Sequence, residues 1–296
     1  MNILITGGAG FIGSHLVDAL VADHEVTVLD DFSSGRRSNV HDSATVVEGD
    51  VRDEQTIAEA AGDVDVIFHE AASVSVERSV AEPEYSHAVN VDATLSLLET
   101  ARKRDARCVL ASSAAVYGEP ASVPIPESEP LAPTSPYGIE KTSIDQYARV
   151  YNELYDLPTV ALRYFNVYGP RQTAGDYSGV ISTFLDQARA NDPITVHGDG
   201  TQTRDFVHVE DVVRVNLLAM ETDHVGEAYN VGTGDTVTIA ELARAVREVV
   251  GSDSEIVHTE GRAGDINHSC AEITKARERL GYEPTVPLAD GLGTLT

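Results

Sequence analysis

The residues of this sequence best placed to do chemistry are a tyrosine and a lysine four positions apart, Tyr137 and Lys141. Residues four apart on a helix share one face, so the phenol and the ammonium group would project into the same space. A nearby cation stabilises a phenolate and lowers the pKa of a tyrosine from its usual value of about 10. Alone, the pair also fits ordinary surface packing. Ser113, just past a predicted strand at 107–111, adds a hydroxyl, and the three groups beside a dinucleotide would make a centre for hydride transfer.

A glycine-rich segment near the N-terminus is suited to hold that dinucleotide. Gly7, Gly10 and Gly13 follow an apolar run at 2–6 and open a helical pattern. Residues without a Cβ let the backbone turn tightly and approach a pyrophosphate, and the first turn of the helix presents free N–H donors. Because the motif lies at a strand–turn–helix junction, we interpret it as a dinucleotide-binding loop and not as an ordinary glycine-rich turn.

Two adjacent carboxylates, Asp30 and Asp31, end the next predicted strand. A carboxylate at this place accepts hydrogen bonds from both adenosine ribose hydroxyls and repels a 2′-phosphate. Arg36 and Arg37 would favour NADP, but they lie further along the loop, where we expect them to face solvent or the adenine. The sequence therefore favours NAD.

The segments that must position these residues alternate between strand and helix patterns. Strands are predicted at 2–6, 26–29, 64–68, 107–111 and 159–163, and helices at 11–22 and 85–103. A further helix begins at Ser135–Pro136, with serine as N-cap and proline at the first helical position. This alternation indicates a parallel sheet covered on both faces. Beyond about Phe165 the pattern becomes that of a smaller, loop-rich α/β lobe, with helices expected near 209–220, 239–250 and 272–280.

The composition limits the partners and the location. Forty-eight acidic residues against 21 basic ones give a formal net charge of −27 over 296 residues, which excludes a nucleic-acid backbone and disfavours an anionic membrane surface. We find no signal-peptide pattern and no stretch near the ~20 apolar residues that span a bilayer. Cys108 and Cys270 fit neither a disulfide framework nor a metal-binding spacing, and the histidines form no ligand cluster. We therefore expect a cytoplasmic protein with reduced cysteines and no metal.

The basic residues are themselves unusual, because only Lys103, Lys141 and Lys275 are lysines. Dispersed acidic residues with almost no lysine are typical of proteins adapted to concentrated salt, while an ordinary acidic cytosolic enzyme is the alternative. At molar salt the Debye length falls to ~3 Å, which screens the mutual repulsion. We expect halophilic behaviour.

Taken together, the motifs resemble those of the extended short-chain dehydrogenase/reductase superfamily, and within it most closely the UDP-glucose 4-epimerases and related nucleotide-sugar epimerases. The resemblance covers essentially the whole chain. It rests on ten ordered segments: TGGAGFIGSHL (6–16), LDDFSSGRR (29–37), GDVRD (49–53), HEAA (69–72), NVDAT (90–94), SSAAVYG (112–118), SPYGIEK (135–141), RYFNVYGPRQ (163–172), TRDFVHVEDV (203–212) and GRAGD (261–265).

The resemblance implies roles for residues around an NAD cofactor. Phe11 and Ile12 would supply backbone amides to the pyrophosphate, beside the three glycines of the loop. The remaining positions that match cofactor-contacting residues of the family are Asp30, Asp31, Ser34, Gly35, Asp50, Val51, Ala71, Ala72, Asn90 and Tyr164. Of these, Asp31 stands where relatives often have asparagine, and Tyr164 matches a neighbour of the nicotinamide.

On the substrate side the resemblance implies a UDP-sugar. Asn166 matches a residue that grips the diphosphate, Arg204 and Arg262 match arginines that clamp it, and Asp265 matches a contact on the ribose or uracil side. A guanidinium suits phosphate because its fork bonds two oxygens at once. The alternative for either arginine is a surface ion pair.

Two alanines argue for the subgroup. Sugar-nucleotide 4,6-dehydratases of the superfamily carry an acidic pair after the catalytic serine or threonine, where this sequence has Ala114 and Ala115. Neither alanine can act as acid or base, so the pattern disfavours dehydration and favours reversible oxidation. Epimerases and decarboxylases that act on UDP-glucuronate stay open as alternatives. A cofactor-sensing protein without activity is a further alternative, and it would be expected to lack the tyrosine or the lysine.

The resemblance thus implies a doubly wound Rossmann domain at 1–167, with a returning segment near 205–231, and a smaller α/β lobe at 168–296 that binds the nucleotide sugar. Tyr137 would take the proton of the sugar 4-hydroxyl, Ser113 would orient that hydroxyl, and Lys141 would bond the nicotinamide ribose and hold the tyrosine pKa down. Relatives commonly pair as homodimers through two helices each, here 85–103 and 136–154.

Overall fold

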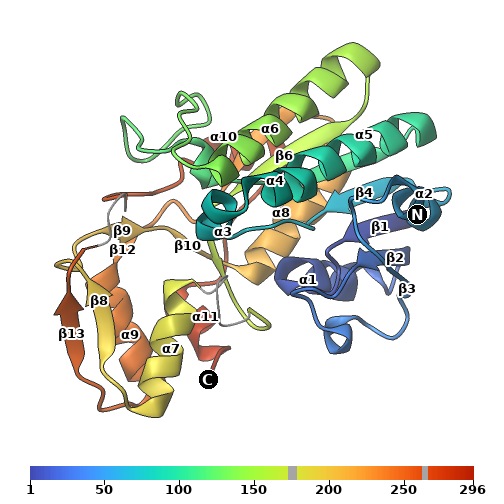
Figure 1. Cartoon of the computed structure of the whole chain (residues 1–296). Coiled ribbons are helices and arrows are strands. Elements are labelled where there is room, and N and C mark those ends of the chain that lie inside the picture. Colours follow the sequence, from blue (N-terminus) through green and yellow to red (C-terminus); the bar gives the residue numbers. More distant parts are fainter. Residues whose placement is uncertain (173–178, 262–265) are drawn as a thin grey trace.

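A seven-stranded parallel sheet lies at the centre of the molecule in the computed structural model, which describes residues 1–172, 179–261 and 266–296 (Figure 1). Its strands are β1 (Asn2–Thr6), β2 (Glu25–Asp30), β3 (Thr45–Glu48), β4 (Val66–His69), β5 (Arg107–Ser113), β6 (Thr159–Tyr164) and β11 (Glu227–Val231). The order β11-β6-β5-β4-β1-β2-β3 runs outward in both directions from the β1–β4 pair. Such a switch point opens a crevice at the carboxyl ends of the strands. The doubly wound α/β fold is therefore confirmed.

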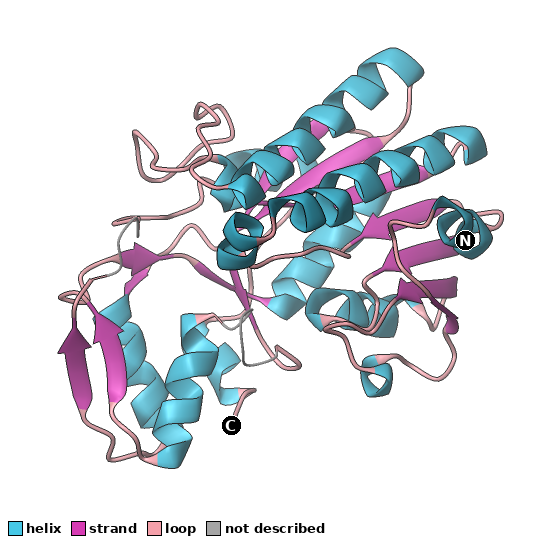
Figure 2. Ribbon diagram, viewed as in Figure 1, coloured by secondary structure: helices cyan, strands magenta, loops and turns pink. Residues whose placement is uncertain are grey.

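Helices cover both faces of this sheet (Figure 2). One face carries α1 (Phe11–Leu20) and α8 (Val209–Glu221), whose buried side chains include Leu16 and Val215. The other face carries α2 (Glu54–Ala61), α5 (Ala93–Arg104) and α6 (Pro136–Tyr155), with Leu97 and Ile144 in the core. Burying a leucine, isoleucine or valine contributes roughly 1.5–3 kcal/mol each, so the two apolar layers hold the sheet edge in a fixed shape.

The start of α6 is built as the sequence predicts. The Ser135 hydroxyl accepts a hydrogen bond from the Gly138 N–H at 3.1 Å, and Pro136 takes the first helical position. An N-cap serine satisfies one of the N–H groups that a helix leaves without an internal partner. This cap fixes the first turn of α6, which carries Tyr137.

The helical pattern at 85–103 is interrupted in the structure. It consists of α4 (Pro83–His87), a π-helical turn η2 (Ala88–Asp92) and α5. Asn90 lies in the π-helical turn and is almost fully buried. Single π-helical turns inside helices often mark sites where a side chain must be redirected.

A second apolar cluster holds the C-terminal lobe together. It packs α7 (Val180–Ala190) against α9 (Ile239–Val250), with α11 (Leu288–Gly293) beside them. Three two-stranded pairs complete this part of the chain: β7 (Asn166–Tyr168) with β10 (Phe206–His208), β9 (Thr203–Arg204) with β12 (Val237–Thr238), and β8 (Ile194–His197) with β13 (Ile256–Thr259). The remaining helices are α3 (Val76–Ala81), α10 (Thr274–Leu280) and the short turns η1 (Arg37–Asn39) and η3 (Ala114–Val116).

The edge strand of the main sheet comes from the C-terminal half of the chain, within the segment near 205–231 that the resemblance expects to return to this domain. The strand pattern at 159–163 marks the last strand of the N-terminal series, but β11 from the C-terminal half pairs in parallel with β6 and forms the edge. The segment that contains α8 and β11 therefore returns to the sheet. Within the described ranges, no helix is both long and apolar enough to cross a membrane.

Candidate active site

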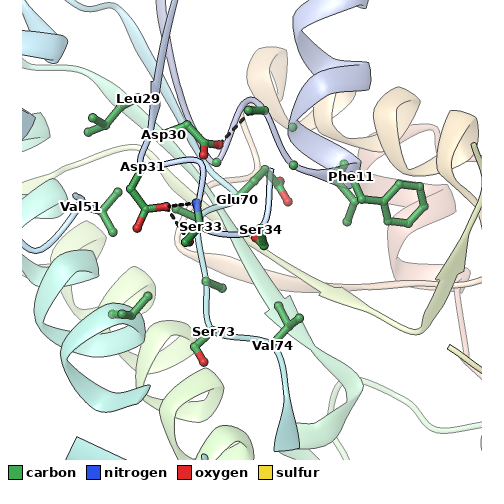
Figure 3. Close-up of a pocket in the computed structure, with 18 of the residues that line it drawn as sticks. Phe11, Leu29, Asp30, Asp31, Ser33, Ser34, Val51, Glu70, Ser73 and Val74 are labelled. Atoms are coloured by element: carbon green, nitrogen blue, oxygen red, sulfur yellow. Dashed lines mark hydrogen bonds between the residues drawn. The ribbon is translucent and has the colours of Figure 1, made fainter. Parts of the chain in front are cut away.

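A cavity of about 320 Å³ opens at the carboxyl edge of the sheet, over the switch point between β1 and β4 (Figure 3). It runs between two groups of side chains. The Asp30 end comprises Asp30, Asp31, Ser34, Asp50 and Val51. The Tyr137 end comprises Glu70, Ser113, Tyr137 and Tyr164, with Lys141 packed behind.

The glycine-rich loop forms the floor between the two ends. Gly7 has a φ of +70°, and a Cβ there would come within 2.7 Å of the Ala71 backbone nitrogen. The Gly10 N–H donates to the Gly7 carbonyl at 3.0 Å and turns the chain into α1. Phe11 and Ile12, in the first turn of α1, line the cavity. The helix thus directs its positive N-terminal end into the space where the sequence predicts a pyrophosphate.

At the Asp30 end, the carboxylate is fixed before any ligand binds. Asp30 accepts hydrogen bonds from the Ala9 N–H at 2.9 Å and from the Phe32 N–H at 2.8 Å, and its burial raises its pKa. Each oxygen keeps a second lone pair for a ribose hydroxyl. Asp31 is exposed and accepts from the Ser33 N–H at 2.9 Å, so it shapes the loop (Figure 3).

A stack of three side chains borders the same end. The Tyr85 ring lies under two guanidinium groups, with Arg78 at 4.2 Å and Arg52 at 5.0 Å from its centroid. Arg52 also pairs with Asp50, which lowers the pKa of that carboxyl group. Arg78 and Tyr85 both line the cavity, and the motif comparison did not indicate either of them.

At the Tyr137 end, three predicted residues come together. Ser113 and Tyr137 both line the cavity, where the Ser113 hydroxyl favours a lower pKa of Tyr137, and the Lys141 Nζ lies 5.8 Å from the centre of the Tyr137 ring. Lys141 does not face open space, since its Nζ donates to the Ala111 carbonyl at 2.7 Å. Burial lowers the pKa of Lys141 to about 8, against the carboxyl groups of Glu70, Glu140 and Asp145, which favour its charged form.

The expected lowering of the Tyr137 pKa by Lys141 stays a prediction, because Lys141 is not among the groups that shift this pKa in the protein without its cofactor. Burial raises the pKa of Tyr137 to about 12, and the carboxyl group of Glu140 adds to the rise, although the Ser113 hydroxyl opposes it. Moving a phenolate out of water costs more free energy than the contacts around the Tyr137 hydroxyl recover. A further positive charge in the cavity is needed to bring the phenolate within reach of neutral pH.

Sequence reasoning missed Glu70, the second residue of the HEAA segment. It lines the cavity, and its Oε1 accepts a hydrogen bond from the Tyr164 hydroxyl at 2.8 Å. Burial raises the pKa of Glu70 to about 7. A carboxyl group two residues past the predicted strand at 64–68, in a segment whose alanines were already assigned, was the available signal.

Two other predicted cofactor residues do not reach the cavity. Asn90 is buried, its Oδ1 accepts from the Ser73 N–H at 2.9 Å, and its Nδ2 donates to the Ser73 carbonyl at 2.9 Å and to Glu140 at 2.6 Å. It therefore supports the wall at Ser73 and does not itself line the cavity. Gly35 packs against the Ala9 backbone. The cavity is lined by three other residues that were predicted to contact the cofactor, Ala71, Ala72 and Tyr164.

The predicted substrate residues are spread more widely. The Asn166 Nδ2 donates to the Asp205 carbonyl at 2.9 Å, which links β7 to the TRDFVHVEDV segment. Arg204 lines a second cavity of about 330 Å³ in the C-terminal lobe, beside Phe206 and Val237. Arg262 and Asp265 lie outside the described residues.

Comparison with known proteins identifies the family of the chain. The model of the NAD dependent epimerase/dehydratase family matches residues 3–232. The chain belongs to the NAD-dependent epimerase/dehydratase family. The UDP-glucose 4-epimerase of Mycolicibacterium smegmatis is 41% identical over 301 residues, which cover 99% of this chain and 96% of that protein.

Solved structures agree with this assignment. The UDP-glucose 4-epimerase of Thermotoga maritima, solved with UDP-glucose, superposes with a TM-score of 0.96 at 41% identity and covers 99% of this chain and 97% of its own. The UDP-N-acetylglucosamine 4-epimerase of Methanobrevibacter ruminantium, in complex with UDP-N-acetylmuramic acid, has a TM-score of 0.95 at 37% identity and covers 99% and 96%.

As a member of this family the chain depends on NAD, and the cavity fits that cofactor. The cradle at Gly7 leaves room that a Cβ would fill, and the N-terminus of α1 faces the same space. The Ser73 hydroxyl oxygen in the cavity wall is buried and has no hydrogen-bond partner in the described part of the chain.

Proposed function

We propose that the chain catalyses the NAD-dependent epimerisation at C4 of a UDP-sugar, of the UDP-glucose/UDP-galactose type. The observation that carries this proposal is the convergence of Ser113 and Tyr137 in the wall of the cavity, with Lys141 behind the tyrosine ring. The relatives that act on UDP-glucose support the choice of substrate.

Tyr137 acts as the base in this mechanism. Bound NAD supplies a hydride acceptor at its nicotinamide ring, and the positive charge of that ring favours the phenolate of Tyr137. The phenolate takes the proton of the sugar 4-hydroxyl while Ser113 holds the hydroxyl in line, and a 4-keto sugar results. Lys141 keeps a positive charge beside the phenolate and moves from the Ala111 carbonyl toward the cofactor ribose.

The return step runs through the same groups. Tyr137 gives its proton back to the C4 oxygen after the keto sugar has turned over, and the hydroxyl forms with the opposite configuration. Dehydration would require an acid or base next to Ser113, but η3 places alanines at 114 and 115 there, and the Ala115 N–H donates to the Ser113 hydroxyl at 3.2 Å. The geometry therefore favours epimerisation over elimination.

The second cavity is our proposed site for the nucleotide. Arg204 brings a guanidinium, Phe206 an aromatic ring and Val237 an aliphatic wall, which together suit a diphosphate and a base. We further propose that residues 168–296 form the substrate lobe, with 205–231 returning to the Rossmann domain 1–167. Asn166, Arg262 and Asp265 remain proposed substrate contacts.

One experiment decides among the substrates. The purified protein is incubated with a panel of UDP-, dTDP- and GDP-sugars, and the products are resolved by chromatography. We expect interconversion of UDP-glucose and UDP-galactose. Conversion of UDP-N-acetylglucosamine alone, or epimerisation or loss of carbon dioxide with UDP-glucuronate, would replace the proposed substrate, and no turnover with any sugar would contradict an enzymatic role.

We also propose a homodimer formed through α5 and α6, which pack against each other on one face of the sheet (Figure 1). Leu154 and Tyr155 at the end of α6 are 66% and 50% exposed, and Tyr155 packs edge-to-face against Tyr151 with ring centroids 5.1 Å apart. Light scattering of the wild type and of Leu154→Glu tests the proposal. A monomeric wild type contradicts it.

The low lysine content supports one more proposal, that the chain is adapted to concentrated salt. Its formal net charge of −27 would strain the fold in dilute buffer.

A further inference from the structure

A half-buried carboxyl group in the cavity wall takes no part in the mechanism above. Glu70 follows β4 directly and contributes to the cavity wall together with Ser113, Tyr137 and Tyr164. In the view of Figure 3 its carboxyl group lies between Asp30 and Phe11, among the side chains that surround the cavity. It is hydrogen-bonded to Tyr164, the position that the family resemblance matches to a neighbour of the nicotinamide, and this contact places it near the hydride acceptor of the proposed function.

Glu70 is held in place by a chain of hydrogen bonds from the far side of the sheet. The Tyr164 hydroxyl donates to Glu70 Oε1 at 2.8 Å, and the Asn216 Nδ2 on α8 donates to the Tyr164 oxygen at 2.8 Å. Asn216 is fully buried. Because each donor is itself fixed, the carboxyl group cannot turn away from the cavity without breaking a buried hydrogen bond.

The charged groups around Glu70 come from different elements. Lys141 on α6 favours its ionised form, and the Tyr164 hydrogen bond from β6 acts in the same direction. His69, the residue before it, faces the Thr6 and Thr94 hydroxyls at 2.7 and 3.0 Å, and burial holds its pKa at about 3, so that it stays neutral. Burial outweighs the two stabilising contacts, so Glu70 changes its charge near neutral pH.

A carboxylate in this position interacts differently with the two forms of the cofactor. The oxidised nicotinamide ring is positively charged and the reduced ring is neutral. A negative charge nearby, in a low dielectric, stabilises the oxidised form. Hydride transfer removes two electrons and a proton from C4 of the sugar, while the hydroxyl proton goes to Tyr137. A carboxylate that disfavours the reduced ring also favours the return of that hydride.

We propose that Glu70 is a positioning residue that sets the balance between oxidised and reduced bound cofactor, so that the 4-keto sugar is reduced again before it can leave. The role in returning the hydride to the sugar rests on the proposed function. The effect on the bound cofactor can be tested without it, because that test uses no sugar nucleotide. The proposal assigns a role to a side chain of the HEAA segment that the Ser–Tyr–Lys chemistry leaves unused.

The test is a redox titration of the purified holoenzyme without any sugar nucleotide. The protein is equilibrated with a two-electron dye, and the reduced cofactor is followed by its near-ultraviolet absorbance in wild type and Glu70→Gln, on both sides of about pH 7. We expect the glutamine variant to hold roughly tenfold more reduced cofactor above this pH, a shift of about 30 mV for a two-electron couple. The two proteins should converge as the pH falls and Glu70 takes up a proton.

Two further variants keep the test decisive. Glu278→Gln removes an exposed carboxylate on α10 outside the cavity and should leave the titration unchanged. Tyr164→Phe removes the hydrogen bond that favours the carboxylate, so it should move the balance part of the way in the same direction, and it carries the test if Glu70→Gln fails to fold. Identical titrations of wild type and Glu70→Gln at every pH, an equal shift with Glu278→Gln, or an opposite shift with Tyr164→Phe would overturn the proposal. A shift in a protein that epimerises no sugar would contradict the proposed function alone.

Discussion

Two carboxyl groups in the cavity wall show opposite effects: an ion pair lowers the pKa of Asp50 at the Asp30 end, whereas burial raises the pKa of Glu70 at the Tyr137 end, as it also raises that of Asp30. Asp50 is paired with Arg52, which lowers its pKa, so it stays ionised at any pH near neutrality. Glu70 and Lys141 are enclosed instead, and their pKa values shift toward each other, to about 7 and about 8.

This difference matches what each end has to do. A group that only binds a ribose or an adenine works best with a constant charge. Hydrogen bonds from backbone N–H groups or an ion pair with a guanidinium favour the ionised form of such a carboxyl group. Groups beside a hydride and proton transfer must gain or lose a proton as the charge on the substrate and cofactor changes. A pKa near the working pH allows this. The following predictions test the contrast between the two ends.

The largest effect is expected at the Tyr137 end. Tyr137→Phe removes only the proton acceptor, so turnover should fall by a factor of about 10²–10⁴ or more, while NAD and the sugar nucleotide remain bound. Steady-state assays and calorimetric binding measure the two quantities separately. Tyr155→Phe, on the exposed end of the same helix, is the matched control and should keep full activity. Near-normal turnover of Tyr137→Phe would remove the tyrosine from the mechanism.

At the Asp30 end the expected effect is on the choice of cofactor and not on the chemistry. Asp30→Ala removes the carboxylate that would bond the ribose hydroxyls and repel a 2′-phosphate, and hydrogen bonds to charged groups contribute about 1.5–3 kcal/mol. The preference for NAD over NADP should therefore fall roughly tenfold or more. Affinities of both cofactors are compared in the variant, with Asp31→Asn as control, and an unchanged ratio would show that Asp30 is not the ribose ligand.

The molecular surface offers a third comparison with the cavity. The repulsion among exposed carboxylates is screened by salt, while the enclosed groups at the Tyr137 end are hardly affected. We expect the thermal midpoint and the activity to rise with potassium or sodium chloride between about 0.1 and 2 M. A midpoint that stays flat or falls over this range would contradict halophilic adaptation and leave the epimerase proposal intact.

The smallest effects concern stability, and the two ends should give opposite signs. The pKa of Glu70 is raised on folding from 4.5 to about 7, so its ionised form destabilises the fold once the pH rises through about 7. Glu70→Gln should then melt higher than wild type above this pH and approach it as the pH falls. Thermal melting of the cofactor-free protein over a pH series measures the difference.

Asp50 provides the matched comparison. Its pKa is lowered from 3.8 by Arg52, so its contribution to stability is present above that pH and lost as the pH falls through the depressed value. Asp50→Asn should lower the melting temperature at neutral pH by an amount that corresponds to at most about 1 kcal/mol, as is usual for a solvent-accessible ion pair. If both variants shift melting in the same direction, the contrast between the two ends is wrong.

The sequence was sufficient for the elements that carry strong local signals. The glycine loop at 7–13 and the N-cap at Ser135 depend on neighbouring residues alone, and both were predicted at the right place. The alternation of strand and helix patterns predicted the parallel sheet. The edge strand β11 could not be placed in this way, because its pairing with β6 depends on contacts between distant parts of the chain.

The charges of the site were harder to predict than its residues. Spacing alone places Lys141 beside Tyr137, but burial raises the tyrosine pKa, and burial is a property of the packed structure. Asn90 lies in a matching motif, yet the π-helical turn directs its side chain to Ser73 and Glu140. Glu70 gave only a weak signal, its place just after a strand in the HEAA segment, because its hydrogen bonds come from Tyr164 and Asn216 in distant parts of the chain.

The central claim is that Tyr137 and the bound cofactor oxidise the sugar at C4 and reduce it again within one closed cavity. UDP-glucose carrying deuterium at C4 tests this most directly, with the product followed by mass spectrometry and proton NMR. The account predicts UDP-galactose that retains the deuterium at C4, since the hydride that leaves is the one that returns. Loss of the deuterium to solvent, or formation of a product without inversion at C4, would contradict it.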